Sequence, residues 1–179
     1  MNGSGKIRSL SYGSVKALIE SSVSGESRKP QTAEDSKPRD FRLSYLLDTN
    51  ACIALINGKP AAVRNRFQKA IHAGEQVNVS TVAVFELWYG VEKSEQKEEN
   101  TNRLQTFLGG PITFVAFEEE DAKVAGVIRA ALGKIGRPIG AYDLLIAGQA
   151  VRQKMTLVSA NSKEFSRVKG LIWEDWAKS

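Results

Sequence analysis

The pattern of hydrophobic and polar positions changes near residue 43. Ser, Gly, Lys, Pro and Glu dominate residues 21–40, a composition that offers too little apolar surface for a core. From residue 43 onward, short apolar runs alternate with longer stretches of helical periodicity. We therefore expect residues 1–42 to be a disordered or weakly structured N-terminal extension, dispensable for folding and activity. Residues 43–179 should form the folded domain. The alternative for the extension is a docking segment built on Val15, Leu18 and Ile19.

The folded part is expected to alternate strands and helices. Segments rich in β-branched, aromatic and leucine residues predict five strands, at about residues 43–47, 76–80, 112–117, 156–159 and 168–173. Helical periodicity with suitable end residues predicts helices at about residues 51–57, 61–73, 81–91, 101–108, 118–134 and 141–153. This alternation is typical of a parallel sheet with helices on both faces. The sequence thus predicts an α/β three-layer sandwich with a mainly parallel five-stranded sheet.

The first predicted strand ends at Asp48. Leu46 and Leu47 precede this acid in an apolar run, whereas Thr49 and Asn50 after it favour helix caps and tight turns. In open parallel sheets, ligands bind at the carboxyl ends of the strands. Asp48 is therefore either a carboxylate that takes part in chemistry or an N-cap that binds only its own helix. This motif alone does not separate the two interpretations.

Two further acids occur in predicted helices. Glu86 lies within residues 81–90, which are otherwise almost wholly apolar, so its carboxylate needs a partner or a wet crevice. Asp143 follows Gly140 in the first turn of a helix, where an acid can also serve only to stabilise that helix. In a parallel sheet, Asp48, Glu86 and Asp143 would project toward the same edge. Their mutual repulsion favours a bound cation, and Mg²⁺ or Mn²⁺ suits a site of oxygen ligands.

The composition excludes two kinds of site. The chain has a net charge of +5, one cysteine and one histidine, Cys52 and His72. These counts exclude an internal disulfide and a zinc site built from several Cys and His side chains. His72 is expected at a helix end, where it offsets the helix dipole. No apolar run approaches the roughly 20 residues of a membrane span, so we expect no membrane association and a cytoplasmic location.

Four motifs occur in order between Leu43 and Trp176. They are Leu-Leu-Asp-Thr-Asn at residues 46–50, Ser80 with Glu86, Leu87 and Gly90, Pro138-Ile139-Gly140 with Asp143, Ile146 and Ala147, and Leu-Val-Ser-Ala-Asn at residues 157–161 with Glu164, Phe165, Val168, Gly170, Leu171 and residues 174–176. Together they resemble the PIN-domain ribonucleases, specifically the VapC-type toxins of bacterial toxin–antitoxin systems.

The resemblance implies a PIN-like fold and a metal-dependent endoribonuclease that hydrolyses RNA phosphodiester bonds. It implies that Asp48, Glu86 and Asp143 bind Mg²⁺ or Mn²⁺. Asn161 stands at a fourth active-site position that often carries Asp in the family, and it brings no charge. Three hydroxyl and amide side chains are expected to support the metal ligands: Ser159, Thr49 and Asn50. A type II antitoxin whose C-terminal segment lies across the active-site groove, and a homodimer, are the implied protein partners.

Two alternatives change the function. A catalytically silent PIN-like module would bind nucleic acid or an antitoxin, although the three intact acids argue against it. A phosphatase with an aspartyl nucleophile would need a second Asp where Asn50 stands. Trp88 and Tyr89 are candidates for a dimer or antitoxin surface, with core packing as the alternative. Four basic residues are candidates for phosphate contacts, although solvated helix faces explain them equally well: Arg129, Arg137, Arg152 and Lys154.

Overall fold

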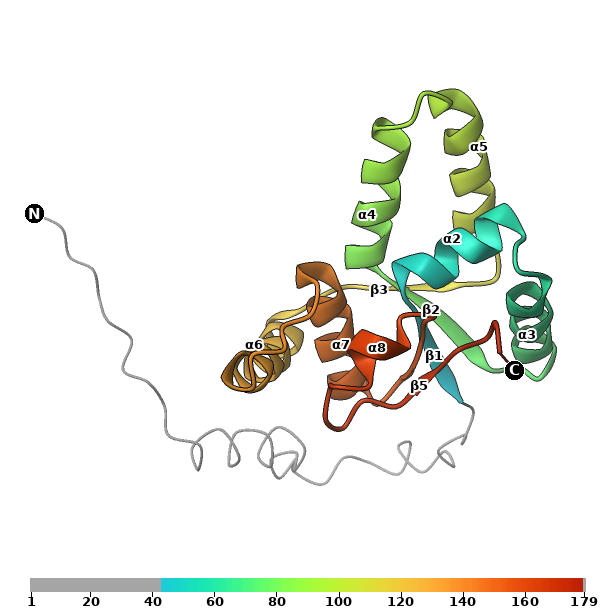
Figure 1. Ribbon diagram of the computed structural model, residues 1–179. Helices are drawn as coiled ribbons and strands as arrows, with labels where there is room; N and C mark the ends of the chain where they lie inside the picture. The colour runs from blue at the N-terminus through green and yellow to red at the C-terminus, as the bar shows by residue number, and fades with distance from the viewer. Residues whose placement is uncertain (1–42, 179) are drawn as a thin grey trace, which may run out of the picture. The chain divides into compact units, whose positions relative to one another are not determined.

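Five parallel strands form the centre of the protein in a computed structural model that describes residues 43–178 (Figure 1). The expectations for residues 1–42 lie outside the described residues. The strands run in the order β3-β2-β1-β4-β5 across the sheet. Their bounds are β1 Ser44–Leu47, β2 Gln76–Ser80, β3 Thr113–Val115, β4 Thr156–Val158 and β5 Trp173–Glu174. All four neighbouring pairs are parallel, which confirms the predicted sheet.

Helices follow or connect the strands nearly as predicted. Their bounds are α2 Thr49–Asn57, α3 Ala61–His72, α4 Thr81–Glu92, α5 Lys97–Leu108, α6 Glu119–Lys134, α7 Ala141–Gln153 and α8 Ser162–Phe165. Gly58 ends α2 in the left-handed conformation, with φ of 66°, as expected of a glycine C-cap. At the start of α4, the Ser80 side chain accepts a hydrogen bond from the backbone N–H of Val82. None of the described helices is long and apolar enough to cross a membrane.

The strand order reverses direction at β1, which creates a topological switch point between β1 and β4. The chain moves from β1 to β2 and β3 on one side, and then returns to β4 and β5 on the other. Right-handed crossovers in these opposite directions place helices on both faces of the sheet. The carboxyl ends of β1 and β4 are neighbours, joined by a 3.1 Å hydrogen bond from Asp48 N to Val158 O. Ligands of such sheets bind at this kind of junction.

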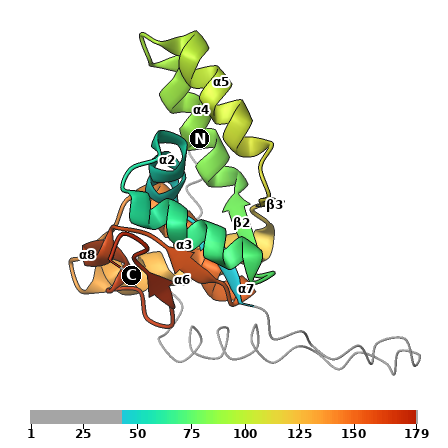
Figure 2. The ribbon, with the colours of Figure 1, turned by 90° about the vertical axis from the view of Figure 1, so that its right-hand side faces the viewer.

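The core lies along the central strands. Tyr45, Leu46 and Leu47 of β1 are fully buried. The ring of Tyr45 packs edge-on against Trp176, with centroids 5.2 Å apart, so the end of the described chain closes over the sheet. Helices α4 and α5 form a pair that projects from the sheet (Figure 1 and Figure 2).

The predicted C-terminal strand is largely wrong. Residues 168–173 were expected to be extended, but β5 contains only Trp173 and Glu174. Gly170 before it has a positive φ of 85°, and the backbone N–H of Leu171 donates to Val168 O, so this segment turns. The one-turn helix α8 was not predicted. At the other boundaries, β3 is shorter than expected and α5 begins earlier, at Lys97, with acids in its first turn that favour a helix start.

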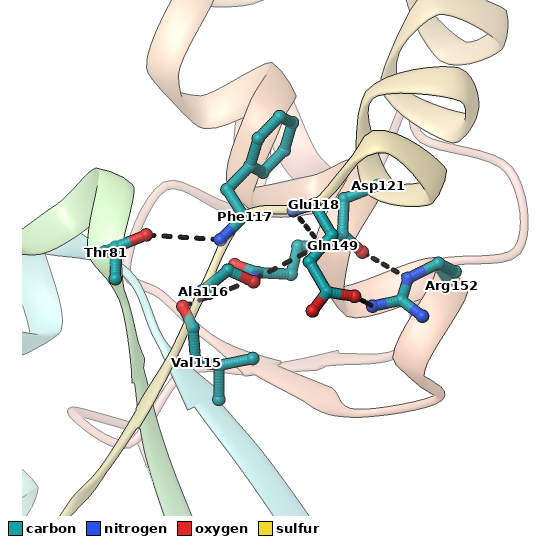
Figure 3. Close-up of polar contacts among 8 residues, drawn as sticks. All are labelled: Thr81, Val115, Ala116, Phe117, Glu118, Asp121, Gln149 and Arg152. Carbon is teal, nitrogen blue, oxygen red and sulfur yellow. Dashed lines mark hydrogen bonds and ion pairs between the residues drawn. The ribbon is translucent and has the colours of Figure 1, made fainter.

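A buried polar network fixes α7 to the start of α6 (Figure 3). Asp121 of α6 is fully buried, accepts a 2.9 Å hydrogen bond from Glu118 N, and forms an ion pair with Arg152 of α7. Gln149 of α7, also fully buried, donates to Ala116 O at 2.7 Å. Because Asp143 lies in the first turn of the same helix, this network holds its backbone in place.

Close packing supports the same contact. A Cβ atom placed on Gly148 of α7 would lie 2.7 Å from the Cβ of Ala125 in α6, so the two helices approach too closely for a larger residue. The start of α4 joins this region through Thr81, whose hydroxyl accepts a 3.2 Å hydrogen bond from Phe117 N.

We expect Arg152→Met to lower the free energy of unfolding by about 1–3 kcal/mol, because it leaves the buried Asp121 carboxylate without its cation. Urea unfolding followed by circular dichroism measures this change. Lys123→Met is the matched control, since its ion pair with Glu119 is exposed and screened by solvent, and its loss should leave the free energy of unfolding nearly unchanged. Equal effects of the two substitutions would show that burial of the Asp121 pair is unimportant.

Candidate functional site

Asp48 begins the site at the junction of β1 and α2. Its Oδ1 accepts a 2.6 Å hydrogen bond from Ala51 N and so caps α2. Its Oδ2 is buried and has no hydrogen-bond partner among the described residues. Both interpretations of Asp48 drawn from the sequence therefore have a basis, because one oxygen caps the helix while the other is left free for a ligand.

The surroundings of Asp48 disfavour the ionised form of its carboxyl group. Burial, and to a smaller extent the negative charges of Asp143 and Glu86, raises the pKa of Asp48 to about 6. The Ser159 hydroxyl and the Ala51 N–H act in the opposite direction. Ser159 follows β4, is itself buried, and accepts a 2.9 Å hydrogen bond from Asn161 N. A bound cation would remove the cost that burial places on this carboxylate.

Glu86 reaches the site from α4. Its side chain is partly buried, and its Oε2 accepts a 2.5 Å hydrogen bond from the Thr49 hydroxyl. Thr49 is the first residue of α2, so this contact joins Glu86 to the residue next to Asp48. Asn50, which was predicted to support the same ligands, is exposed.

Asp143 approaches from the first turn of α7. Its Oδ2 accepts a 3.2 Å hydrogen bond from the Asn161 amide, so these two predicted site residues are in contact. Burial, followed by the charge and hydrogen bonding of Glu164 and the charge of Glu86, raises the pKa of Asp143 to about 6. A Cβ on Gly140 would lie 3.2 Å from Asp143 Oδ2, so the glycine leaves room for the carboxylate at the helix end.

Glu164 is a fourth acid that the sequence reasoning did not place in the site. It lies on the unpredicted helix α8, and its Oε2 accepts a 3.0 Å hydrogen bond from Gly140 N at the start of α7. The sequence showed Glu164 only as part of a motif, three residues after Asn161. Without α8, nothing in the pattern indicated that it faces Asp143.

The acids converge but do not form a closed metal cage. The negative charge of Glu86 raises the pKa of both Asp48 and Asp143, and that of Asp143 also raises the pKa of Asp48, so the three acids lie close together. In residues 43–178, however, no group of three or more His, Cys, Asp or Glu side chains is arranged to hold one ion. Mg²⁺ usually binds through one or two carboxylates and keeps several waters, so an open site with a free Asp48 oxygen suits it.

Within residues 43–178, the acids of the site have no basic partner. No ion pair in the described part of the chain involves Asp48, Glu86, Asp143 or Glu164. Arg152, a candidate for phosphate contact, is instead held by Asp121 and Glu118 of α6. The site therefore presents an uncompensated group of oxygens, which is the donor set of a hard divalent cation.

Comparison with known proteins identifies the family. The sequence model of the PIN domain matches residues 45–171. The chain is 41% identical over 135 residues to a tRNA(fMet)-specific endonuclease VapC of Shigella flexneri, covering 75% of this chain and 99% of that protein. It is 37% identical over 134 residues to ribonuclease VapC2 of Rickettsia felis, covering 75% and 98%. The chain belongs to the VapC ribonucleases of the PIN-domain family.

Solved structures of other family members agree with this assignment. VapBC2 of Rickettsia felis, bound to a DNA fragment from its promoter, matches with a TM-score of 0.70 and 36% identity, covering 75% of this chain and 99% of that one. DNA-bound VapBC of Salmonella typhimurium matches with a TM-score of 0.68 and 36% identity, covering 75% and 98%. The resemblance to PIN-domain ribonucleases of the VapC type, and the PIN-like fold it implied, are confirmed.

We expect the Asp48→Asn protein without metal to be more stable than the wild type by about 1–3 kcal/mol near pH 7.5. The folded state raises the pKa of Asp48 to about 6, so charging this group costs stability as pH rises from about 4 through about 6. The difference between the two proteins should accordingly shrink toward zero near pH 4. Urea unfolding in EDTA at both pH values measures it.

Glu120→Gln, which alters an exposed acid of α6, is the control and should show no such pH dependence. An Asp48→Asn protein that is no more stable than the wild type near neutral pH would contradict the buried, charged state of Asp48.

Proposed function

We propose that this protein is a Mg²⁺- or Mn²⁺-dependent endoribonuclease that serves as the toxin of a type II toxin–antitoxin pair. The observation that carries the proposal is the buried, unpartnered Oδ2 of Asp48, beside Glu86 and Asp143, at the switch point of a VapC-family sheet. Membership of the VapC ribonucleases supports RNA as the substrate.

In this proposal, Asp48, Glu86 and Asp143 hold the metal ion. Bound there, the ion would offset the negative charge that develops on the phosphate and would favour ionisation of a water nucleophile. Thr49 orients the Glu86 carboxylate, and Asn161 orients that of Asp143, through the hydrogen bonds described above. Ser159 favours the charged form of Asp48, which is the form that binds a cation. Asn50 has the weakest support among the proposed positioning residues because it is exposed.

The proposed protein partner is a cognate antitoxin. Support comes from the solved VapBC structures of Rickettsia felis and Salmonella typhimurium, in which a related chain is part of a VapBC assembly. A homodimer and a cytoplasmic location are further proposals, which follow from the family resemblance and from the single cysteine.

We expect Asp48→Asn, Glu86→Gln and Asp143→Asn each to reduce kcat/KM for metal-dependent RNA cleavage by about 100-fold or more, because each removes a charged ligand. The assay uses purified full-length chain without antitoxin, labelled RNA and a titration of Mg²⁺ and of Mn²⁺. Glu119→Gln, an exposed acid on α6, is the control and should cleave as the wild type does.

Full cleavage by a folded Asp143→Asn protein would remove Asp143 from the site. Failure of the wild type to cleave any RNA at any metal concentration would favour the silent binding module instead.

Asn161→Ala should behave differently from the acid variants. Asn161 is uncharged and contacts Asp143, so its loss should mainly raise the metal concentration needed for half-maximal cleavage, by about 10-fold. Titration of Mn²⁺ at fixed RNA concentration measures this shift, and kcat at saturating metal should stay within a few-fold of the wild type. A loss at saturating metal as complete as that of Asp48→Asn would show that Asn161 is as important as the acids.

A further inference from the structure

Exposed aromatic rings gather beside the acids. Among the described residues, four aromatic side chains are exposed: Phe85, Tyr89, Phe114 and Tyr142. The Phe85 ring contacts two of the other three. Phe85 and Tyr89 stack with an interplanar angle of 14° and centroids 6.4 Å apart, and Phe85 meets Tyr142 at 5.6 Å. We call Phe85, Tyr89 and Tyr142 the aromatic patch, and its members are 44–56% exposed.

The patch borders the acidic site at two points. Phe85 of α4 precedes Glu86, and Tyr142 of α7 precedes Asp143. Contact between the Phe85 and Tyr142 rings therefore bridges the two helices that bring these acids to the site. Trp88, which the sequence had grouped with Tyr89, is only partly exposed and packs against the core, so it does not belong to the patch.

A cation stands at the other end of the patch. Lys93, the C-cap of α4, has its Nζ 5.2 Å from the centroid of the Tyr89 ring. Carboxylates, exposed rings and an ammonium group thus follow one another along this part of the surface. Exposed aromatic faces next to a positive charge are how proteins bind single-stranded nucleic acid, because bases stack on the rings while phosphates pair with the cation.

We propose that the aromatic patch binds unpaired bases of the RNA next to the phosphodiester that is cut, with Lys93 contacting a phosphate. This inference rests on the proposed function in that it takes the acids as the place of cleavage. Nucleotides that flank a phosphate at the acids must lie close to Glu86 and Asp143, which is where Phe85 and Tyr142 stand. Because base faces are available only where bases are unstacked, the patch selects loops and single strands over duplex RNA.

Binding can be measured apart from cleavage. Variants are made in the full chain on an Asp48→Asn background, and the probe is a fluorescein-labelled, unstructured RNA 12-mer followed by fluorescence anisotropy. We expect Phe85→Leu and Tyr142→Leu each to weaken binding by about 5- to 100-fold, which is the range for loss of one stacked base. Phe85→Tyr and Tyr142→Phe keep the ring and should bind within about 2-fold of the background protein.

Phe114→Leu is the matched control. Phe114 is an exposed aromatic residue of β3 that has no ring contact with the patch, and its loss should leave RNA affinity unchanged. Lys93→Gln should reduce the slope of log Kd against log salt concentration by about 0.7, as expected for one phosphate contact to a single strand. Thermal melting and light scattering of every variant report its folding and its oligomeric state.

Three outcomes overturn the inference. The first is unchanged RNA affinity of Phe85→Leu and Tyr142→Leu. The second is a fall in the molar mass of these variants together with unchanged RNA affinity, which would mean that the patch joins two copies of the chain. The third is a background protein that binds no RNA.

The proposed function fails separately. If the wild type cleaves RNA but the patch variants bind RNA as tightly as the background protein, the proposed nuclease activity stands and the RNA-binding role of the aromatic patch is rejected. If RNA binding depends on the rings but the wild type cleaves no RNA at any Mg²⁺ or Mn²⁺ concentration, the RNA-binding role of the patch stands and the proposed nuclease activity is rejected.

Discussion

The site depends on one carboxyl group that is buried with half of its hydrogen-bonding capacity unused. Asp48 follows the central strand β1, and its Oδ1 caps α2 while its Oδ2 has no partner among the described residues. A buried polar atom without a partner costs stability, and folds keep such atoms mainly where function needs them. The position itself follows from the topology, because β1 and β4 end side by side where the chain changes direction across the sheet. The β1–β4 junction buries the unpartnered Asp48 oxygen, which costs stability, and a ligand bound at the same junction can offset that loss.

The other acids are held by neutral donors instead of by cations. The Thr49 hydroxyl binds Glu86, and the Asn161 amide binds Asp143. Neutral donors fix the direction of a carboxylate without cancelling its charge, so the negative potential of the crevice remains available to an external ion. Arg152, at the opposite end of α7 from Asp143, pairs with the buried Asp121 and so anchors that helix. The structural carboxylate Asp121 thus lies on α6, which carries none of the proposed ligand-binding carboxylates.

Much of this arrangement could be predicted from local patterns in the sequence. Strand length, helical periodicity and end residues such as Gly58 and Ser80 are local signals, and the parallel sheet followed from their alternation. Parallel strands in turn brought Asp48, Glu86 and Asp143 to one edge. The missed features depend on tertiary contacts. Helix α8 is a single turn with too few residues for periodicity, so the approach of Glu164 to Asp143 had no signal. Likewise, only the tertiary structure shows that Trp88 packs against the core while the neighbouring Tyr89 is exposed.

The central claim is that the free oxygen of Asp48 receives a divalent cation. Anomalous diffraction from crystals of the full chain soaked in Mn²⁺ tests it most directly, with an Asp48→Asn crystal treated identically for comparison. The account predicts an anomalous peak bonded to Asp48 Oδ2 in the wild type, within reach of Glu86 or Asp143, and its loss or marked weakening in the variant. A wild-type crystal that shows no peak at Asp48, at a Mn²⁺ concentration that supports RNA cleavage in solution, would contradict it.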